Sequence, residues 1–335
     1  MHRGVLWSRE SSPESARDRA QSRRDVAVGR PFPIEERELI RRSIERLRVA
    51  KGSSPNVGDL VWRRPIFLIA LCGSSATAAA LLWLAAFLTP IGQRVDQAVS
   101  AAFTKAGAQP LEPRIEAVAG LADPRPFLVI GLGIVAFALV RRRMTLAALV
   151  SVILLAANVT TQGLKIAIPS LLERVGRDAN YELVWPSGHA TASMSLALCA
   201  VIVAGPRLRP AATMLGAGYT VAVGYALVAS GSHLPSDVLG GYLVAGSFAL
   251  LGAAGLSALE AGSPKRTASP ARAASPIVAP AVGALGVVAV AGVAVLAKSP
   301  DSWELAQHAP AMAAGASIAA LGVTLIAGLA VAVRH

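Results

Sequence analysis

Eight apolar stretches constrain the fold of this chain more than any other feature. Most contain about the 20 residues that an α-helix needs to cross the hydrocarbon core of a bilayer. Over the whole chain 54% of residues are hydrophobic and 16% are charged, which is outside the range of soluble domains. The sequence therefore predicts an all-α fold, a polytopic membrane helix bundle. The predicted spans are 66–88, 122–140, 144–168, 187–205, 210–229, 236–258, 277–297 and 309–333.

Charge and linker composition divide the chain into four parts. Residues 1–64 hold 15 of the 32 Lys and Arg and 9 acidic residues, so we expect a basic tail that is partly disordered, with a helix near 34–50. Residues 65–258 are predicted to form a six-span core. The linker 259–276, which contains repeated Ser-Pro pairs, is expected to be flexible. Residues 277–335 add two spans whose small residues favour packing or a homo-oligomer.

Basic residues are concentrated in alternate connections between the predicted spans. The basic tail, the run Arg141-Arg142-Arg143 and the 259–276 linker would all lie on one side, which the positive-inside rule places in the cytoplasm. We therefore expect a cell-membrane protein with both termini cytoplasmic and the loops 169–186 and 230–235 outside. Membrane lipids are the expected partners of the basic charge, and nucleic acid is not.

Two polar clusters stand at the starts of predicted spans. Trp185–His189 has the sequence WPSGH and His233–Asp237 the sequence HLPSD. Ser187 suits a helix N-cap, and a glycine after it lets an anion approach the free N–H groups of the helix start. A carboxylate beside a histidine fixes its tautomer and makes the other ring nitrogen more nucleophilic. Each cluster alone also fits an ordinary helix start. The presence of both clusters on one face of the membrane favours phosphoryl chemistry on a lipid-borne substrate.

The third predicted span carries a polar stripe. Its residues are spaced by three and four, so they share one helix face that we expect to point into the bundle. Lys165, near the external end, could neutralise a phosphate oxygen. The alternative is a lysine that extends to the membrane interface. The stripe consists of Asn158, Thr161, Gln162 and Lys165.

These motifs resemble those of the type 2 phosphatidic acid phosphatase superfamily, which includes lipid phosphate phosphatases and vanadium haloperoxidases. Pro186-Ser187-Gly188-His189 matches the family's second motif in full. His233 and Asp237 match the second half of its third motif. The resemblance covers roughly residues 66–258, which it predicts to be a six-span phosphatase-like core.

The resemblance implies a role for each matched residue. His233 would attack phosphorus and carry a phosphohistidine, and Asp237 would orient it. His189 would protonate the leaving group and later activate water. No metal or other cofactor is expected. The implied phosphate-binding groups are Lys165, Ser187 and the N–H of Gly188.

The chain departs from the family's motifs at two arginines. The first motif should end in Arg-Pro, where this chain has Leu172-Glu173, and the third should begin with Ser-Arg, where it has Ala226-Leu227. Electrostatic stabilisation is usually the largest catalytic contribution, so these losses bear directly on activity. Arg174 or Arg177, in the loop that follows Lys165, could replace one of the two.

Several functions are compatible with these residues. The leading one is a membrane phosphatase that hydrolyses a lipid phosphate or diphosphate, such as a polyprenyl diphosphate, phosphatidic acid or a phosphorylated glycolipid precursor. Transfer to an alcohol would make it a phosphotransferase. The missing arginines also fit a catalytically weak or inactive scaffold that binds a lipid phosphate. A metal site of His189, His233 and Asp237 is a weaker alternative, because Lys165 would repel a cation. A transporter is disfavoured because most spans lack charge at mid-membrane depth.

Overall fold

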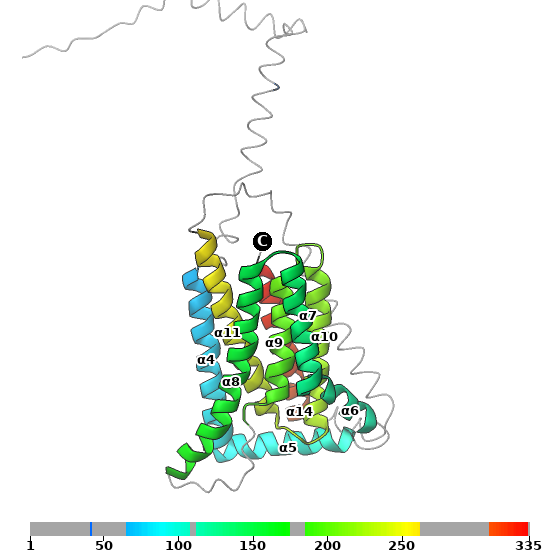
Figure 1. Ribbon diagram of the computed structural model, residues 1–335. Coiled ribbons are helices and arrows are strands. Elements are labelled where there is room, and N and C mark those ends of the chain that lie inside the picture. The colour runs from blue at the N-terminus through cyan, green and yellow to red at the C-terminus, as the bar shows by residue number, and fades with distance from the viewer. Residues whose placement is uncertain (1–40, 42–64, 108–111, 175–184, 262–307, 334–335) are drawn as a thin grey trace, which may run out of the picture. The chain divides into compact units, whose positions relative to one another are not determined.

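The computed structural model describes residues 41, 65–107, 112–174, 185–261 and 308–333 (Figure 1). The chain forms two units, 1–56 and 57–335, and every described residue except Arg41 belongs to the second. All regular elements in the described ranges are helical, which confirms the all-α class. They are α4 (Pro65–Leu88), α5 (Pro90–Gly107), α6 (Glu112–Ala119), η1 (Gly120–Ala122), α7 (Pro124–Val140), α8 (Met144–Arg174), α9 (Gly188–Val203), α10 (Arg209–Ala229), α11 (Pro235–Ala261) and α14 (Ala309–Ala332).

Several of the described helices are long and apolar enough to cross a membrane. Five pass by themselves, and a sixth span results if α6 to α7, bent by 48°, is counted as one. The bend falls just before Pro124, the first residue of α7. With 16 residues, α9 is shorter than a full span. The chain is thus a multi-pass membrane protein. The five helices are α4, α8, α10, α11 and α14.

Most of the predicted spans coincide with described helices. The largest difference is at α8, which continues to Arg174 instead of ending at 168. Several predictions fall outside the described residues: the basic tail with its helix at 34–50, apart from Arg41, residues 175–184 of the loop 169–186, the part of the linker after Ala261, and the span at 277–297.

Helix α9 lies at the centre of the bundle (Figure 1). It contacts α7, α8, α10, α11 and α14, and its side chains from Ala190 to Cys199 are all buried. Most of these residues are Ala, Ser or Thr, whose small side chains let neighbouring helices approach closely within a membrane. Because α9 is fixed from so many directions, its first residues have a well-defined position at one end of the bundle.

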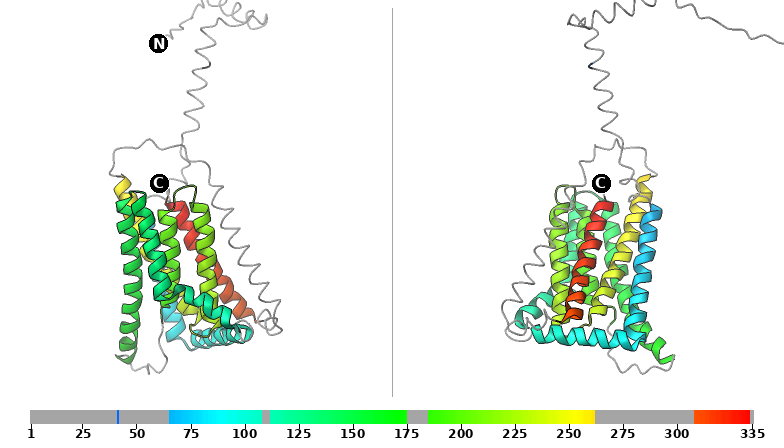
Figure 2. Two further views of the ribbon diagram at one scale, coloured as in Figure 1. Left: turned by 45° about the vertical axis from the view of Figure 1, so that its right-hand side comes forward. Right: turned by 180° about the vertical axis from the view of Figure 1, so that it is seen from behind.

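The segment between the first two predicted spans is also largely helical. Helix α5 lies crosswise to the spans, across one end of the bundle (Figures 1 and 2). It buries Val99 and Asp96 toward the bundle and exposes Ile91 and Val95. Such a helix is amphipathic rather than uniformly apolar, so its sequence lacks the continuous apolar run of a membrane span.

Helix α14 is part of the same hydrophobic core as the preceding spans. It contacts α9, α10 and α11 and appears in red among them in Figure 2. Ile318 and Ile326 are fully buried in that core, and the hydroxyl of Tyr225 on α10 donates to the carbonyl oxygen of Gly315 at 2.8 Å. The small residues of this helix therefore pack within the chain. A homo-oligomer remains an expectation from the sequence.

Candidate active site

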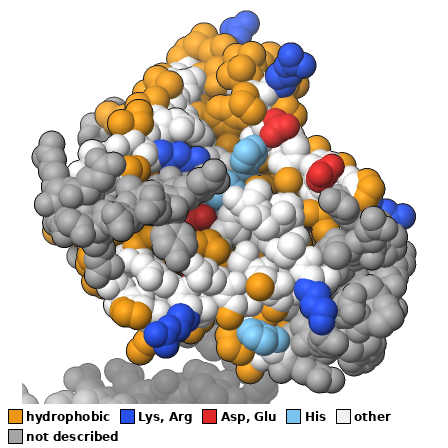
Figure 3. Space-filling model, turned by 90° about the horizontal axis from the view of Figure 1, so that it is seen from below, with side chains coloured by type: hydrophobic (Ala, Val, Ile, Leu, Met, Phe, Trp, Pro, Cys, Tyr) orange, Lys and Arg blue, Asp and Glu red, His pale blue; other side chains and the backbone are white. Residues whose placement is uncertain are grey.

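The two histidines of the sequence motifs meet at the end of the bundle that α5 crosses. His189 is the second residue of α9, and His233 lies just before α11. Their ring centroids are 6.4 Å apart, with the ring planes at 61°. Figure 3 views this end and shows histidine and acidic side chains in contact near the middle of the face. The pair comes together because α9 and α11 both begin at this end and pack side by side.

His233 and Asp237 form a buried pair. Nδ1 of His233 is 3.4 Å from Oδ2 of Asp237, and the two residues are 7% and 3% exposed. The same oxygen accepts the N–H of Leu234 at 3.0 Å, while Oδ1 has no hydrogen-bond partner among the described residues. A carboxylate on Nδ1 selects the tautomer that carries its proton there, which leaves the lone pair on Nε2. In this arrangement Nε2 is the ring nitrogen of His233 that could act as a nucleophile.

Hydrogen bonds connect the start of α9 to the start of α11. The N–H of Ser187 donates to the carbonyl oxygen of Asp237 at 3.0 Å, and Nε1 of Trp185 donates to the carbonyl oxygen of Ser236 at 3.2 Å. A Cβ on Gly241 would lie 2.7 Å from the carbonyl oxygen of Ser187, so this approach requires glycine. These contacts position both polar clusters together. Sequence spacing gives no indication of them.

Lys165 lies against the first residue of α9. A Cβ atom placed on Gly188 would be 3.5 Å from Nζ of Lys165 and 3.6 Å from Nε2 of Gln162. Ser187 caps the helix, its hydroxyl accepting the N–H of Ala190 at 3.3 Å. A helix start with free N–H groups and an adjacent ammonium group attracts an anion such as phosphate.

The rest of the polar stripe on α8 also faces α9. The hydroxyl oxygens of Thr161 and Thr191 are 3.0 Å apart, and Nδ2 of Asn158 is 3.4 Å from Oγ of Ser195. Asn158 and Thr161 therefore point into the bundle, as the spacing predicted, whereas Gln162 is exposed and lines a groove described below. These contacts fix the rotation of α8 so that Lys165 faces the start of α9.

Two carboxylates that the sequence did not indicate also lie at this end. Oδ1 of Asp123 is 2.9 Å from Nε2 of His189. Asp96, on α5, accepts two hydrogen bonds from Ser236, one from its N–H at 3.2 Å and one from its hydroxyl. Burial raises the pKa of the Asp96 carboxyl and the nearby charge of Asp237 adds to this, while the two hydrogen bonds oppose it. For Asp123, the signal available in the sequence was the Asp123-Pro124 pair, which is typical of a helix start.

The proposed substitutes for the missing arginines are not placed at the site. Arg174 ends α8, about 14 Å along the helix axis from Lys165, and its side chain lies outside the described residues. Arg177 lies outside them altogether. Within the described part of the chain no group of three or more His, Cys, Asp or Glu has a geometry that could hold a metal ion, so the geometry does not support the metal site of His189, His233 and Asp237.

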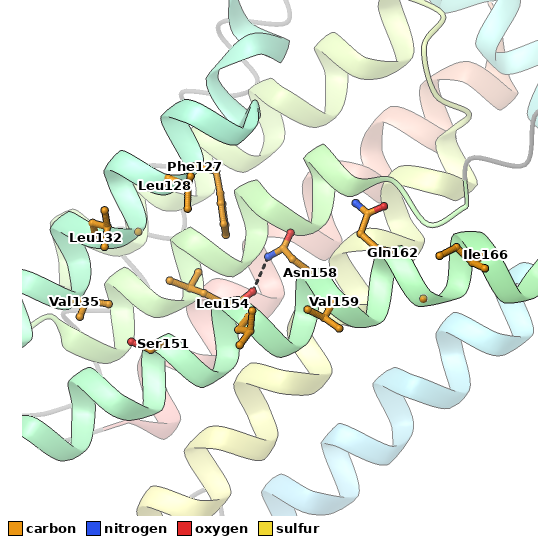
Figure 4. Close-up of a pocket in the computed structure, with 13 residues that line it drawn as sticks. Phe127, Leu128, Leu132, Val135, Ser151, Leu154, Asn158, Val159, Gln162 and Ile166 are labelled. Atoms are coloured by element: carbon orange, nitrogen blue, oxygen red, sulfur yellow. Dashed lines mark hydrogen bonds between the residues drawn. The ribbon is translucent and has the colours of Figure 1, made fainter.

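A largely apolar groove lies between α7 and α8 (Figure 4). Its volume is about 620 Å³. On α8 it extends from Ser151 to Ile166, about 22 Å along the axis. The part of the groove nearest Ile166 includes Gln162, which adjoins Gly188 at the start of α9. The groove therefore runs from the histidine end of the bundle toward its middle.

Residues 73–259 match the PAP2 superfamily. The match covers more than half of the 335 residues, so the chain belongs to this superfamily, whose members are generally lipid phosphate phosphatases. This confirms the resemblance on which the motif assignment depends. The matched region contains Lys165 and both histidines but not α14. No curated protein and no solved structure matched the chain.

Proposed function

We propose that this protein is a phosphatase that hydrolyses a lipid phosphate or diphosphate at the external face of the cell membrane. The observation that carries the proposal is the arrangement of His233 with Asp237 behind it and the His189 ring 6.4 Å away. A nucleophile with an orienting carboxylate and a second histidine as acid is the set of groups that phosphoryl transfer through a covalent intermediate requires.

In the proposed mechanism His233 acts first. Its Nε2 attacks phosphorus, while the ammonium of Lys165, the hydroxyl of Ser187 and the N–H of Gly188 hold the phosphate oxygens. His189 gives a proton to the leaving oxygen as the phosphorus–oxygen bond breaks. In the second half, His189 takes a proton from water, whose oxygen attacks the phosphohistidine and releases phosphate and free His233.

The groove between α7 and α8 supports a lipid as the substrate. It is lined mainly by apolar side chains, and Leu128, Val159 and Ile166 at its edge are well exposed, as residues that face lipid would be. A substrate whose phosphate is held at the start of α9 could place a hydrocarbon chain there. A polyprenyl diphosphate, phosphatidic acid or a phosphorylated glycolipid precursor would each have such a chain.

The missing arginines bear on the rate and on the alternatives. With Lys165 as the described cation beside Gly188, the developing negative charge receives less stabilisation than the family's motifs supply. We propose that Arg174 or Arg177 supplies part of it. The alternatives are a catalytically weak scaffold that binds a lipid phosphate, which the missing arginines favour, and a phosphotransferase with an alcohol as acceptor.

Release of phosphate by purified protein tests the function. In detergent micelles containing EDTA, we expect phosphate release from at least one member of a panel of polyprenyl diphosphate, phosphatidic acid and lysophosphatidic acid. The His233→Ala protein is the matched control. Binding without release would favour the scaffold. Appearance of a phosphorylated alcohol instead of free phosphate would indicate a phosphotransferase. Activity that EDTA abolishes would contradict the metal-independent mechanism.

Membrane orientation can be tested at the two ends of α10. Arg207 and Ser232 are exposed and lie on opposite sides of this one span. In a background with Cys72 and Cys199 replaced, Ser232→Cys should react with an impermeant thiol reagent in intact cells. Arg207→Cys should react only after the membrane is permeabilised. The reverse pattern would place the site in the cytoplasm.

A further inference from the structure

We propose that Asp123 is the positioning carboxylate of His189 and fixes the histidine that protonates the leaving group. This inference depends on the proposed function. Oδ1 of Asp123 is 2.9 Å from Nε2 of His189, a shorter contact than the 3.4 Å between Asp237 and His233. Each histidine of the site therefore has its own carboxylate.

The local sequence leaves the Asp123 carboxylate available for this contact. Asp123 is the N-cap of α7, where an aspartate normally accepts the N–H of the second or third helical residue. Its side chain makes no such bond here. The third helical residue is Pro126, which has no N–H to give. A cap residue whose side chain does not bond its own helix, and bonds a histidine 66 residues away instead, indicates a role at the site.

The position of Asp123 is fixed by the corner between η1 and α7. Its N–H donates to the carbonyl oxygen of Gly120 at 3.1 Å, and Ala122 is buried. The hydroxyl of Tyr219 on α10 donates to the carbonyl oxygen of Leu121 at 3.0 Å. The corner is thus attached to a spanning helix, and the carboxylate is held where His189 can reach it.

The contact determines which ring nitrogen of His189 reacts. With the Nε2 proton directed at Asp123, Nδ1 is the nitrogen that gives a proton to the leaving oxygen as that oxygen's bond to phosphorus breaks. His189 then keeps its Nε2 proton and has a lone pair on Nδ1, which accepts a proton from the attacking water. His189 and Asp123 are 37% and 56% exposed as side chains, so the proton on Nδ1 can be exchanged with solvent. His233 and Asp237 are buried by contrast.

Leaving-group dependence separates this role from a merely structural one. A lipid monoester leaves as an alkoxide and needs the proton from His189, whereas para-nitrophenyl phosphate leaves as a phenolate and needs little protonation. In Asp123→Asn we expect kcat for the lipid monoester to fall roughly tenfold to hundredfold, a part of the factor of about 10²–10⁴ that a general acid contributes. Release of para-nitrophenol should fall much less. Asp123→Glu, which keeps the carboxylate, should recover part of the loss.

The matched control is Glu116→Gln, the same change of charge at an exposed carboxylate on the neighbouring α6. We expect it to leave both rates unchanged. Equal losses on the two substrates in Asp123→Asn, or no loss on either, would overturn the assignment of Asp123 while the phosphatase activity of the unaltered protein stands. If the unaltered protein releases phosphate from neither substrate, the proposed function itself fails, and the role of Asp123 with it.

Discussion

Replacing His233 with alanine should abolish both turnover and the covalent phosphoenzyme. Its ring is the nucleophile in the proposed mechanism, and its Nδ1 is held by the buried carboxylate of Asp237 at 3.4 Å. Alanine removes the atom that bonds to phosphorus, so the phosphohistidine intermediate cannot form at all. The measurement is the label retained on protein quenched after brief exposure to ³²P-labelled substrate, tested for the acid lability of a phosphohistidine.

His308 provides a matched histidine control. It caps α14, where its Nδ1 accepts the N–H of Ala311 at 3.3 Å. His308→Ala should lose about 1 kcal/mol of helix-cap stabilisation and retain the labelled intermediate. Undiminished phosphate release by His233→Ala would end the phosphohistidine proposal. Label that persists in His233→Ala would move the nucleophile to another residue.

Replacing His189 with alanine should slow turnover of a lipid monoester by about 10²–10⁴-fold, the usual contribution of a general acid. The second half of the reaction also needs this residue, as a base that activates water. With para-nitrophenyl phosphate, which needs little protonation to leave, phosphorylation of His233 should therefore continue while hydrolysis of the intermediate slows. We expect a burst of para-nitrophenol followed by a slow steady rate, measured by stopped-flow absorbance.

The amplitude of that burst is the informative quantity. It should approach one para-nitrophenol per active site in His189→Ala. It should be absent in the double variant with His233→Ala, which has no nucleophile. If His189→Ala is fully active on the lipid monoester, the second histidine is not the acid. If it gives no burst and no label, His189 is needed before the phosphoenzyme forms.

The membrane helices could be predicted because their signal is local. A span of about 20 apolar residues satisfies its own backbone hydrogen bonds and buries its side chains in hydrocarbon. The limits of α4, α10 and α14 accordingly lie within two residues of the apolar stretches. Helix α5 was missed because it lies across the end of the bundle and is only half apolar. Its partner, the start of α11, lies about 140 residues away in the chain.

The candidate site likewise has features that the sequence predicted and features that it did not. The sequence by itself predicted most residues of the candidate site, because the spacing of His233 and Asp237 and the cap at Ser187 are properties of single helix starts. Only the tertiary structure decided that these starts meet, through the backbone contact of Ser187 with Asp237. The tertiary structure alone brings His189 into contact with Asp123. It also places α14 within the hydrophobic core instead of beside that core. The physical reason is that local patterns encode a helix and its cap. A contact between distant residues depends on how all the helices pack, which no single segment specifies.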